Sequence, residues 1–173
     1  MANITTTSPG TEPIGDDELL YRQIPVSLNL YDPILRPHLL PDAFRPNAND
    51  ITGLSVYRAK YKSIEQAAQG RSGKQYYVAV LRAGDLRSKG IEISARPLEE
   101  DPGHAEIPGL TYQNRHDDRA LEWKVLLSQE LCLRVEGPFT SPYSDFGIRK
   151  QNEPPSPEGG PSKIWDRGLA EAG

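Results

Sequence analysis

Cysteine is almost absent from the sequence: Cys132 is the only one among 173 residues. A single cysteine forms no internal disulfide and no cysteine-based metal site, and small secreted domains usually depend on such cross-links. The sequence also has no run of eighteen apolar residues, so it predicts no transmembrane helix. Residues 1–15 lack the basic and apolar regions of a secretory signal. We therefore expect a soluble, cytoplasmic protein that does not associate with membranes.

Apolar residues are also scarce, at 36% of the chain. The shortage is greatest at the two ends, residues 1–15 and 138–173, and the second of these contains six of the sixteen prolines. Such segments bury too little apolar surface to offset the entropy that is lost on ordering. We predict a flexible N-terminal segment at 1–15, a globular domain at 16–137, and a flexible tail, rich in proline and glycine, at 138–173.

Strands are predicted where apolar residues alternate with polar ones or form a short uninterrupted run. Six segments fit this description: residues 19–24, 54–58, 76–81, 91–95, 104–107 and 131–135. Three short helical segments are interspersed with them, at residues 63–69, 85–89 and 117–128. Because no regular alternation of strand and helix is present, we predict a single α+β domain with a mixed or mainly antiparallel sheet and two to three short helices.

Charge is unevenly distributed along the chain. The net charge of −4 and the sequence pI of about 5.4 argue against binding to nucleic acid. Residues 22–74 nevertheless contain eight basic and four acidic side chains, whereas residues 99–130 contain eight acidic and three basic ones. These two regions either pair with each other in the fold or form a dipolar surface that steers a charged ligand.

His104 and Glu106 are two residues apart on a predicted strand, so their side chains share one face. With Asp101 just before them, they have the donor atoms of a metal site or of an acid–base pair. The alternative is structural: residues 101–103 form a turn that His104 caps. No second pair of histidines at ligand spacing is present in the sequence, so we predict neither a metal nor a bound cofactor.

Four short motifs follow one another in the first two thirds of the chain. They are Leu20-Tyr21-Arg22 with Ile24-Pro25, Ala43-Phe44 with Pro46, Leu54-Ser55-Val56, and Asp101-Pro102-Gly103-His104-Ala105. In this order they resemble a pattern that recurs in a family of small bacterial proteins, over residues 19–110. That family has no assigned activity, so the resemblance implies a bacterial protein and carries no functional residue.

Arg22 lies on the first predicted strand, Ser55 on the second and Glu106 on a later one. This order resembles the R-S-E type ADP-ribosyltransferases, in which the arginine and serine hold the nicotinamide dinucleotide and the glutamate stabilises the transition state. The sequence departs from that pattern in two places: the serine stands in Leu-Ser-Val rather than Ser-Thr-Ser, and His104 occupies the position two residues before the glutamate. The structural alternative is an arginine in a salt bridge, a strand serine and a glutamate at a rim.

Residues 70–74, Gly-Arg-Ser-Gly-Lys, resemble the end of a phosphate-binding loop. The first glycine of that motif falls on Ala68, and the segment follows a helix and precedes a strand, which is the reverse of the required order. We interpret it as a polar connection.

The interpretation that we favour from the sequence is a non-enzymatic protein-binding or accessory module. Its predicted contacts with a protein partner are Phe44 in the long apolar loop 25–50, and Trp165 and Leu169, which lie one helical turn apart in the tail. The alternative is a small nucleotide-using enzyme or toxin in which Arg22, Ser55, His104 and Glu106 converge on one cleft. That alternative requires the four side chains to lie within about 10 Å of one another.

Overall fold

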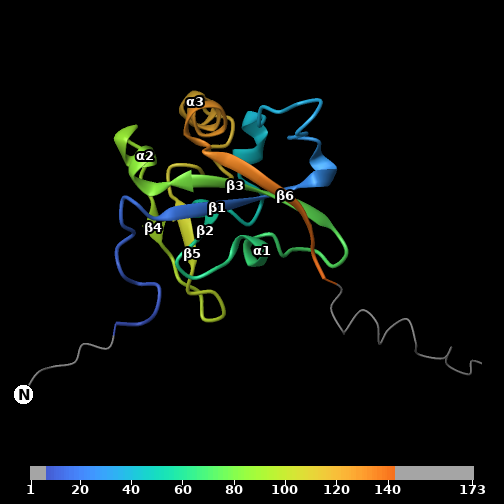
Figure 1. Ribbon diagram of the computed structural model, residues 1–173. Coiled ribbons are helices and arrows are strands. Elements are labelled where there is room, and N and C mark those ends of the chain that lie inside the picture. The colour runs from blue at the N-terminus through green and yellow to red at the C-terminus, as the bar shows by residue number, and fades with distance from the viewer. Residues whose placement is uncertain (1–6, 143–173) are drawn as a thin grey trace, which may run out of the picture. The chain divides into compact units, whose positions relative to one another are not determined.

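The computed structural model describes residues 7–142 and contains one six-stranded sheet with the order β4-β5-β2-β1-β3-β6 (Figure 1). Every neighbouring pair of strands is antiparallel. The strands are β1 (Leu19–Pro25), β2 (Leu54–Arg58), β3 (Gln75–Arg82), β4 (Ser94–Ala95), β5 (His104–Ile107) and β6 (Arg134–Thr140). The prediction of an α+β domain with a mainly antiparallel sheet is confirmed.

Three short α-helices accompany the sheet: α1 (Ile64–Ala67), α2 (Ala83–Ser88) and α3 (Asp118–Leu126). Two 3-10 segments, Val26–Leu28 and Pro41–Phe44, lie between β1 and β2, and α3 continues into a π-helical turn at Leu127–Leu131. Helix α1 begins with the predicted capping box, because Gln66 N donates to Ser63 Oγ at 3.2 Å and Ser63 N donates to Gln66 Oε1 at 2.9 Å. None of the helices in residues 7–142 is long and apolar enough to cross a membrane.

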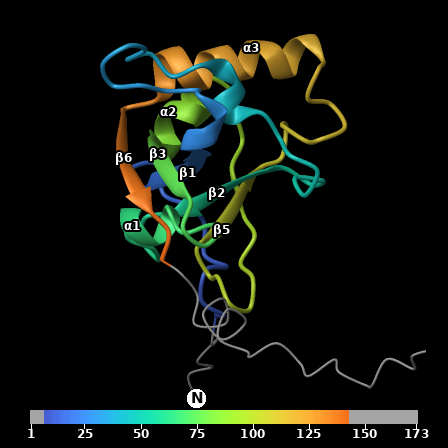
Figure 2. The ribbon, with the colours of Figure 1, turned by 90° about the vertical axis from the view of Figure 1, so that its right-hand side faces the viewer.

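The main core lies on one face of the sheet, under α2, α3 and the segment Pro41–Phe44, as Figures 1 and 2 both show. It is built from alternate strand residues and from the apolar sides of these helices, among them Leu20, Ile24, Leu54, Val56, Leu81, Leu86, Ile107 and Leu127. Phe44 belongs to this core and is 0% exposed. It therefore stabilises the fold and is not available as the partner contact that the sequence suggested.

The opposite face of the sheet has two different halves. Over β1, β3 and β6, helix α1 covers a small apolar cluster that includes Ala68, Tyr76 and Val78. Over β2 and β5 the outward positions are polar instead, because Ser55 and Tyr57 of β2 pair in register with Glu106 and His104 of β5. Paired residues of antiparallel strands project to the same face. Ser55, His104 and Glu106 are therefore on the polar half, whereas Arg22, which shares its side of β1 with Leu20 and Ile24, projects to the core face.

Two predicted strands differ from the observed ones. The segment 91–95 forms ladder pairs only at Ser94–Ala95, and Ile91 instead packs in the core under α2. The last strand begins at Arg134 and runs through Pro138 to Thr140. A proline is tolerated there because β6 is the edge strand of the sheet. The ordered domain thus extends past residue 137, where the sequence placed the start of the tail.

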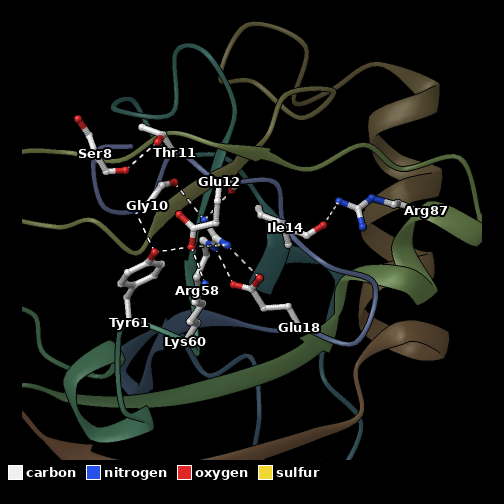
Figure 3. Close-up of polar contacts among 10 residues, drawn as sticks. All are labelled: Ser8, Gly10, Thr11, Glu12, Ile14, Glu18, Arg58, Lys60, Tyr61 and Arg87. Atoms are coloured by element: carbon white, nitrogen blue, oxygen red, sulfur yellow. Dashed lines mark hydrogen bonds and ion pairs between the residues drawn. The ribbon is translucent and has the colours of Figure 1, made fainter. Parts of the chain in front are cut away.

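The N-terminal segment packs against the domain from residue 7 onwards, and Figure 3 shows its polar contacts. Ile14 is 5% exposed and belongs to the core. Gly10 has a φ of +85°, and a Cβ there would lie 2.0 Å from the carbonyl oxygen of Pro102, so only glycine fits this approach. Residues 7–15 are therefore part of the packed domain, whereas the sequence predicted that the domain begins at residue 16.

Arg58 is the centre of these contacts and is fully buried. Its Nε and Nη2 donate to the carboxylate of Glu18 at 2.6 and 3.0 Å, and its Nη1 donates to the carbonyl oxygens of Gly10 and Glu12 at 3.0 and 3.1 Å. The Glu12 carboxylate lies 3.4 Å from Nη2 and also accepts from Lys60 and from the Tyr61 hydroxyl. We call this group of residues the Arg58 clamp.

Candidate functional site

Strands β1 and β2 are in register only at Leu20 with Arg58 and Tyr21 with Tyr57, and they diverge beyond these pairs. The divergence leaves a cleft of about 340 Å³ between the second half of β1 and the start of β2. We call it the β1–β2 cleft. Its polar lining consists of Arg22, Gln23, Asp42, Arg45, Asn47, Asn49, Asp50, Ser55 and Tyr57. It therefore contains two of the four residues that the sequence proposed as a site.

Arg22 is held in this cleft by backbone carbonyl groups. Its Nη1 donates to Ser55 O at 3.0 Å, its Nε to Ala43 O at 3.3 Å and its Nη2 to Arg45 O at 3.3 Å. Within residues 7–142 it makes no ion pair, unlike the salt-bridged arginine of the structural alternative. Burial lowers the pKa of Arg22, and the nearby carboxylate of Asp50 opposes this shift.

A guanidinium group has five N–H donors, and three of those of Arg22 are used by carbonyl groups. The charge of Arg22 is thus oriented but not neutralised by a carboxylate in contact with it. This is the arrangement that suits a planar, bidentate contact with a phosphate or carboxylate of a ligand.

Ser55 is fixed by a buried aspartate. The Ser55 hydroxyl donates to Asp50 Oδ1 at 2.8 Å, and the Ser55 backbone N–H donates to the same oxygen at 3.1 Å. Asp50 is 2% exposed, and its Oδ2 accepts from Asn47 N at 2.9 Å. Asp50 therefore ties the Asn-rich turn before β2 to the serine of the candidate site.

His104 contacts the same serine from β5. Its Nε2 lies 3.3 Å from Ser55 Oγ, and its Nδ1 lies 2.8 Å from the carbonyl oxygen of Arg96. Because a carbonyl oxygen only accepts, the Arg96 contact requires the proton of the ring to be on Nδ1. The ring also meets Tyr57 edge-on, with 6.4 Å between ring centroids.

Glu106 is the cross-strand partner of Ser55 but does not line the cleft. Both of its carboxylate oxygens accept from Thr52 Oγ1, at 2.9 and 3.0 Å, and Arg96 Nε lies 3.9 Å away. The chain reaches this position because residue 53 is glycine: a Cβ there would lie 2.9 Å from Glu106 Cβ. The glutamate is 9% exposed, so Thr52 covers it rather than leaving it at a rim.

The structure places Arg22, His104 and Glu106 next to Ser55 along the sheet, but the four side chains do not converge on one cleft, as the enzyme alternative required. Arg22 bonds to the Ser55 carbonyl, His104 meets its hydroxyl, and Glu106 stands opposite it on the next strand. The three strands that carry them, β1, β2 and β5, are neighbours in the sheet. Arg22 and Ser55 share the β1–β2 cleft, whereas His104 and Glu106 lie on the other side of β2.

Sequence reasoning missed three contributors to the cleft: Asp50, Arg45 and Tyr57. Burial raises the pKa of Tyr57, the charge of Asp101 adds to this shift, and the positive charge of Arg22 opposes it. The run Asn47-Ala48-Asn49-Asp50 before β2 was the available signal, since such side chains bond to their own turn and place a carboxylate at its end.

The Asp101 turn is structural. His104 N donates to Asp101 O at 3.2 Å, and Asp101 Oδ2 forms an ion pair with Lys62 Nζ at 2.7 Å. Asp101 therefore does not join His104 and Glu106 in one ligand set. In the part of the chain that the structure describes, no group of three or more His, Cys, Asp or Glu side chains is placed to hold a metal. Trp165 and Leu169, the partner contacts predicted in the tail, lie outside the described residues.

The segment 70–74 is a connection, as the sequence indicated. Four of its backbone N–H groups already have partners: Gly70 N donates to Ser141 Oγ, Arg71 N to Tyr76 Oη, Gly73 N to Ser141 O and Lys74 N to Arg71 O. A phosphate-binding loop uses such N–H groups for the ligand. This loop therefore presents side chains rather than its backbone.

Comparisons of the chain with protein-family models, with curated proteins and with solved structures gave no match. The resemblance to a family of small bacterial proteins therefore stays a prediction.

Proposed function

We propose that the protein is a small nucleotide-using enzyme that binds a nicotinamide dinucleotide in the β1–β2 cleft, in the manner of the R-S-E type ADP-ribosyltransferases that its residue order resembles. The observation that carries this proposal is Arg22: an arginine oriented by three carbonyl groups, without an ion pair in residues 7–142, in a cleft that Ser55 also lines. Arg22 binds the pyrophosphate, and Ser55, held by Asp50, positions the ribose next to nicotinamide.

The position of Glu106 fits the third role in that resemblance. Strand β2, which carries Ser55, lies between β1 and β5 in the sheet. A dinucleotide whose pyrophosphate contacts Arg22 reaches Glu106 by passing between the diverging ends of β1 and β2 to the face that carries Ser55 and Glu106. The positive charge that develops on the ribose during the reaction is then stabilised by the Glu106 carboxylate, whose orientation Thr52 fixes.

The reaction is substitution at C1′ of that ribose. The bond from C1′ to the nicotinamide ring nitrogen breaks, and its electron pair stays on the nitrogen. An oxygen of water, or of another acceptor, bonds to C1′ and releases its proton to solvent. The products are nicotinamide and free or transferred ADP-ribose.

The test is a calorimetric titration of the full chain with the dinucleotide, together with chromatographic detection of released nicotinamide. We expect Arg22→Met to weaken binding by tenfold or more, which corresponds to one charge-assisted hydrogen bond of about 1.5–3 kcal/mol. Arg36→Met is the matched control, because Arg36 lies in the loop 25–50 and does not line the cleft. Equal effects of the two substitutions, or no binding by the unaltered chain, would contradict the proposal.

Glu106→Gln separates catalysis from binding. It keeps the shape and the contact with Thr52 but removes the charge, so we expect nicotinamide release to fall about 100-fold with unchanged affinity for the dinucleotide. A fall in affinity with no change in turnover would make Glu106 a structural residue.

Protein binding is a second candidate function, supported by one exposed apolar tip. In the loop 25–50, Ile34 and Leu35 are 86% and 85% exposed, and the backbone bridge between Asp32 and Arg36 closes the turn beneath them. An Ile34→Ser/Leu35→Ser variant should retain its fold, measured by thermal unfolding. Loss of co-purifying protein with this variant, and retention with Leu98→Ser as the control, would favour the binding module; equal recovery would count against it.

A further inference from the structure

A larger hollow of about 960 Å³ lies next to the β1–β2 cleft at the end of β1. The two share the lining residues Gln23, Pro25, Leu28, Asn47 and Asn49, so they are neighbours on the surface. The hollow is bounded on its other side by the loop 70–74, from which Arg71 and Lys74 face into it.

Four basic side chains line the cleft and the hollow: Arg22 and Arg45 line the cleft, and Arg71 and Lys74 line the hollow. None of the four is in an ion pair within residues 7–142. In the same part of the chain, Lys62 with Asp101 is the only ion pair that joins a base of residues 22–74 to an acid of residues 99–130. The basic and acidic regions of the sequence therefore remain largely separate, and the basic one faces the cleft.

The acidic side chains of the cleft are already engaged. Asp50 accepts from Ser55 and Asn47, and Asp42 lies 3.3 Å from Lys124 Nζ. Asp42 is thus paired with a lysine, whereas Asp50 keeps its charge near Arg22; within residues 7–142 neither carboxylate is in an ion pair with one of the four cations.

The loop that carries Arg71 and Lys74 is held firmly against β6. Ser141, which is buried, bonds to Gly70 through its hydroxyl in both directions, and its backbone bonds to Gly73 N and Lys74 O. These contacts fix the loop on both sides of Arg71, so the backbone that carries Arg71 and Lys74 is held in one position. Preorganisation of this kind reduces the entropy lost when a ligand binds.

The two basic ends start from backbone positions that are far apart. Pro25 pairs with Tyr76, so the backbone of Lys74 lies about five residues beyond that of Arg22 along the strand direction, or roughly 16 Å at 3.3 Å per residue. The Arg22 guanidinium is held by the carbonyl oxygens of residues 43, 45 and 55, which fix its position in the β1–β2 cleft. Arg22 and the loop 70–74 therefore contact separate anionic groups.

We propose that Arg71 and Lys74 bind a phosphate monoester of the substrate, separate from the group that Arg22 holds. The identity of the dinucleotide rests on the proposed function, whereas the phosphate subsite does not depend on it. A phosphate monoester carries close to two negative charges at neutral pH, which matches one arginine and one lysine. It is supplied either by a phosphorylated ribose of the dinucleotide or by a second substrate that accepts the ADP-ribosyl group.

The experiment compares the unaltered chain with Arg71→Ala/Lys74→Ala. The control is Arg115→Ala/Arg119→Ala, which removes the same charge from two residues that do not line the cleft. Calorimetry measures binding of the nicotinamide dinucleotide with and without a 2′-phosphate, and of adenosine 5′-monophosphate in the presence of the unphosphorylated dinucleotide. An NMR titration with inorganic phosphate follows the resonances of residues 70–74.

We expect one phosphorylated ligand to bind at least tenfold more tightly than its unphosphorylated counterpart, and Arg71→Ala/Lys74→Ala to abolish that difference while the control retains it. A preference for the 2′-phosphate assigns the subsite to the dinucleotide, and a preference for the monophosphate assigns it to the acceptor. If no dinucleotide binds but phosphate still shifts residues 70–74, the proposed function fails and the subsite stands. Equal affinities and no phosphate shift at residues 70–74 overturn the proposal.

Discussion

Arg22 and Arg58 lie on neighbouring strands, and their surroundings differ in one decisive respect. Arg58 is fully buried and contacts the carboxylates of Glu18 and Glu12 as well as two carbonyl groups. Arg22 has three carbonyl partners and no carboxylate in contact. Both guanidinium groups are held in place, but only that of Arg58 has its charge balanced inside the fold.

This difference separates a structural arginine from one suited to a ligand. In the Arg58 clamp the charges cancel, and the result is the attachment of residues 7–18 to the sheet (Figure 3). In the β1–β2 cleft the charge of Arg22 is left for an anion that enters from solution. The two arginines therefore predict opposite outcomes when each is replaced: loss of stability at one, loss of binding at the other.

The largest effect is expected at Arg58. Replacement by methionine keeps much of the side-chain volume but leaves the Glu18 carboxylate without its cation, while Glu12 keeps its contact with Lys60. Breaking a buried ion pair in this way costs about 3–5 kcal/mol of unfolding free energy. Urea denaturation followed by circular dichroism measures it; a loss below that of Arg22→Met would invert the comparison.

Within the clamp, Glu18 is expected to contribute more than Glu12. Glu18 accepts two hydrogen bonds from Arg58, at 2.6 and 3.0 Å, whereas Glu12 is 3.4 Å away and more exposed. Glu18→Gln should lower the unfolding free energy by about 1.5–3 kcal/mol, the range for hydrogen bonds to charged groups. Glu12→Gln, measured in the same denaturation series, should lower it by less, and the reverse order would mean that Glu12 is the main partner.

A smaller loss of stability is expected at Arg22. Its carbonyl partners remain accessible to water through the cleft after Arg22→Met, so we expect a decrease of about 1 kcal/mol, that of an ordinary hydrogen bond. The binding of the dinucleotide should fall at the same time by tenfold or more, as proposed above. A decrease in stability comparable to that of Arg58→Met would mean that Arg22 is a structural residue, whatever its effect on binding.

The sequence was sufficient to predict most strands, because their apolar residues alternate or run together without interruption. It was also sufficient to predict α1, whose capping box of Ser63 and Gln66 is local. It predicted the last strand at residues 131–135 but missed its continuation to Thr140, because tolerance of Pro138 depends on the strand being at the edge of the sheet, which no local pattern reveals. The packing of Gly10 on Pro102 depends in the same way on two segments far apart in the chain.

In the candidate site, too, the residues could be named from the sequence, but their contacts depend on segments far apart in the chain. Arg22, Ser55 and Glu106 were proposed from their order along the chain, and their proximity depends on the strand order β5-β2-β1, which is a property of the whole sheet. Whether Arg22 has a carboxylate partner was not predictable, because its partners are backbone carbonyls of residues 43, 45 and 55. Phe44 looked like an exposed anchor because its loop lacks regular structure, yet it is a core residue.

The smallest effect concerns Lys60, at the solvent side of the Arg58 clamp. The pKa of Glu12 is lowered from 4.5 to about 2. The hydrogen bond from Lys60 is the largest cause of this shift, and the hydrogen bond from Tyr61 is the next. A carboxyl group with a lowered pKa stabilises the fold above its ordinary pKa and loses that contribution as the pH falls through the folded value. The stability that Glu12 provides should therefore decline between about pH 4.5 and pH 2.

Lys60→Ala should raise the pKa of Glu12 towards 4.5 and so flatten this decline. We expect the melting temperature of the variant to be slightly lower than that of the unaltered protein at pH 7, and the two to converge as the pH approaches 2. Lys74→Ala is the control, because Lys74 is not in an ion pair within residues 7–142 and should leave the profile unchanged. Parallel profiles for all three proteins would mean that solvent, rather than Lys60, sets the charge of Glu12, and that the balance of charge in the clamp rests on Glu18 and Arg58 alone.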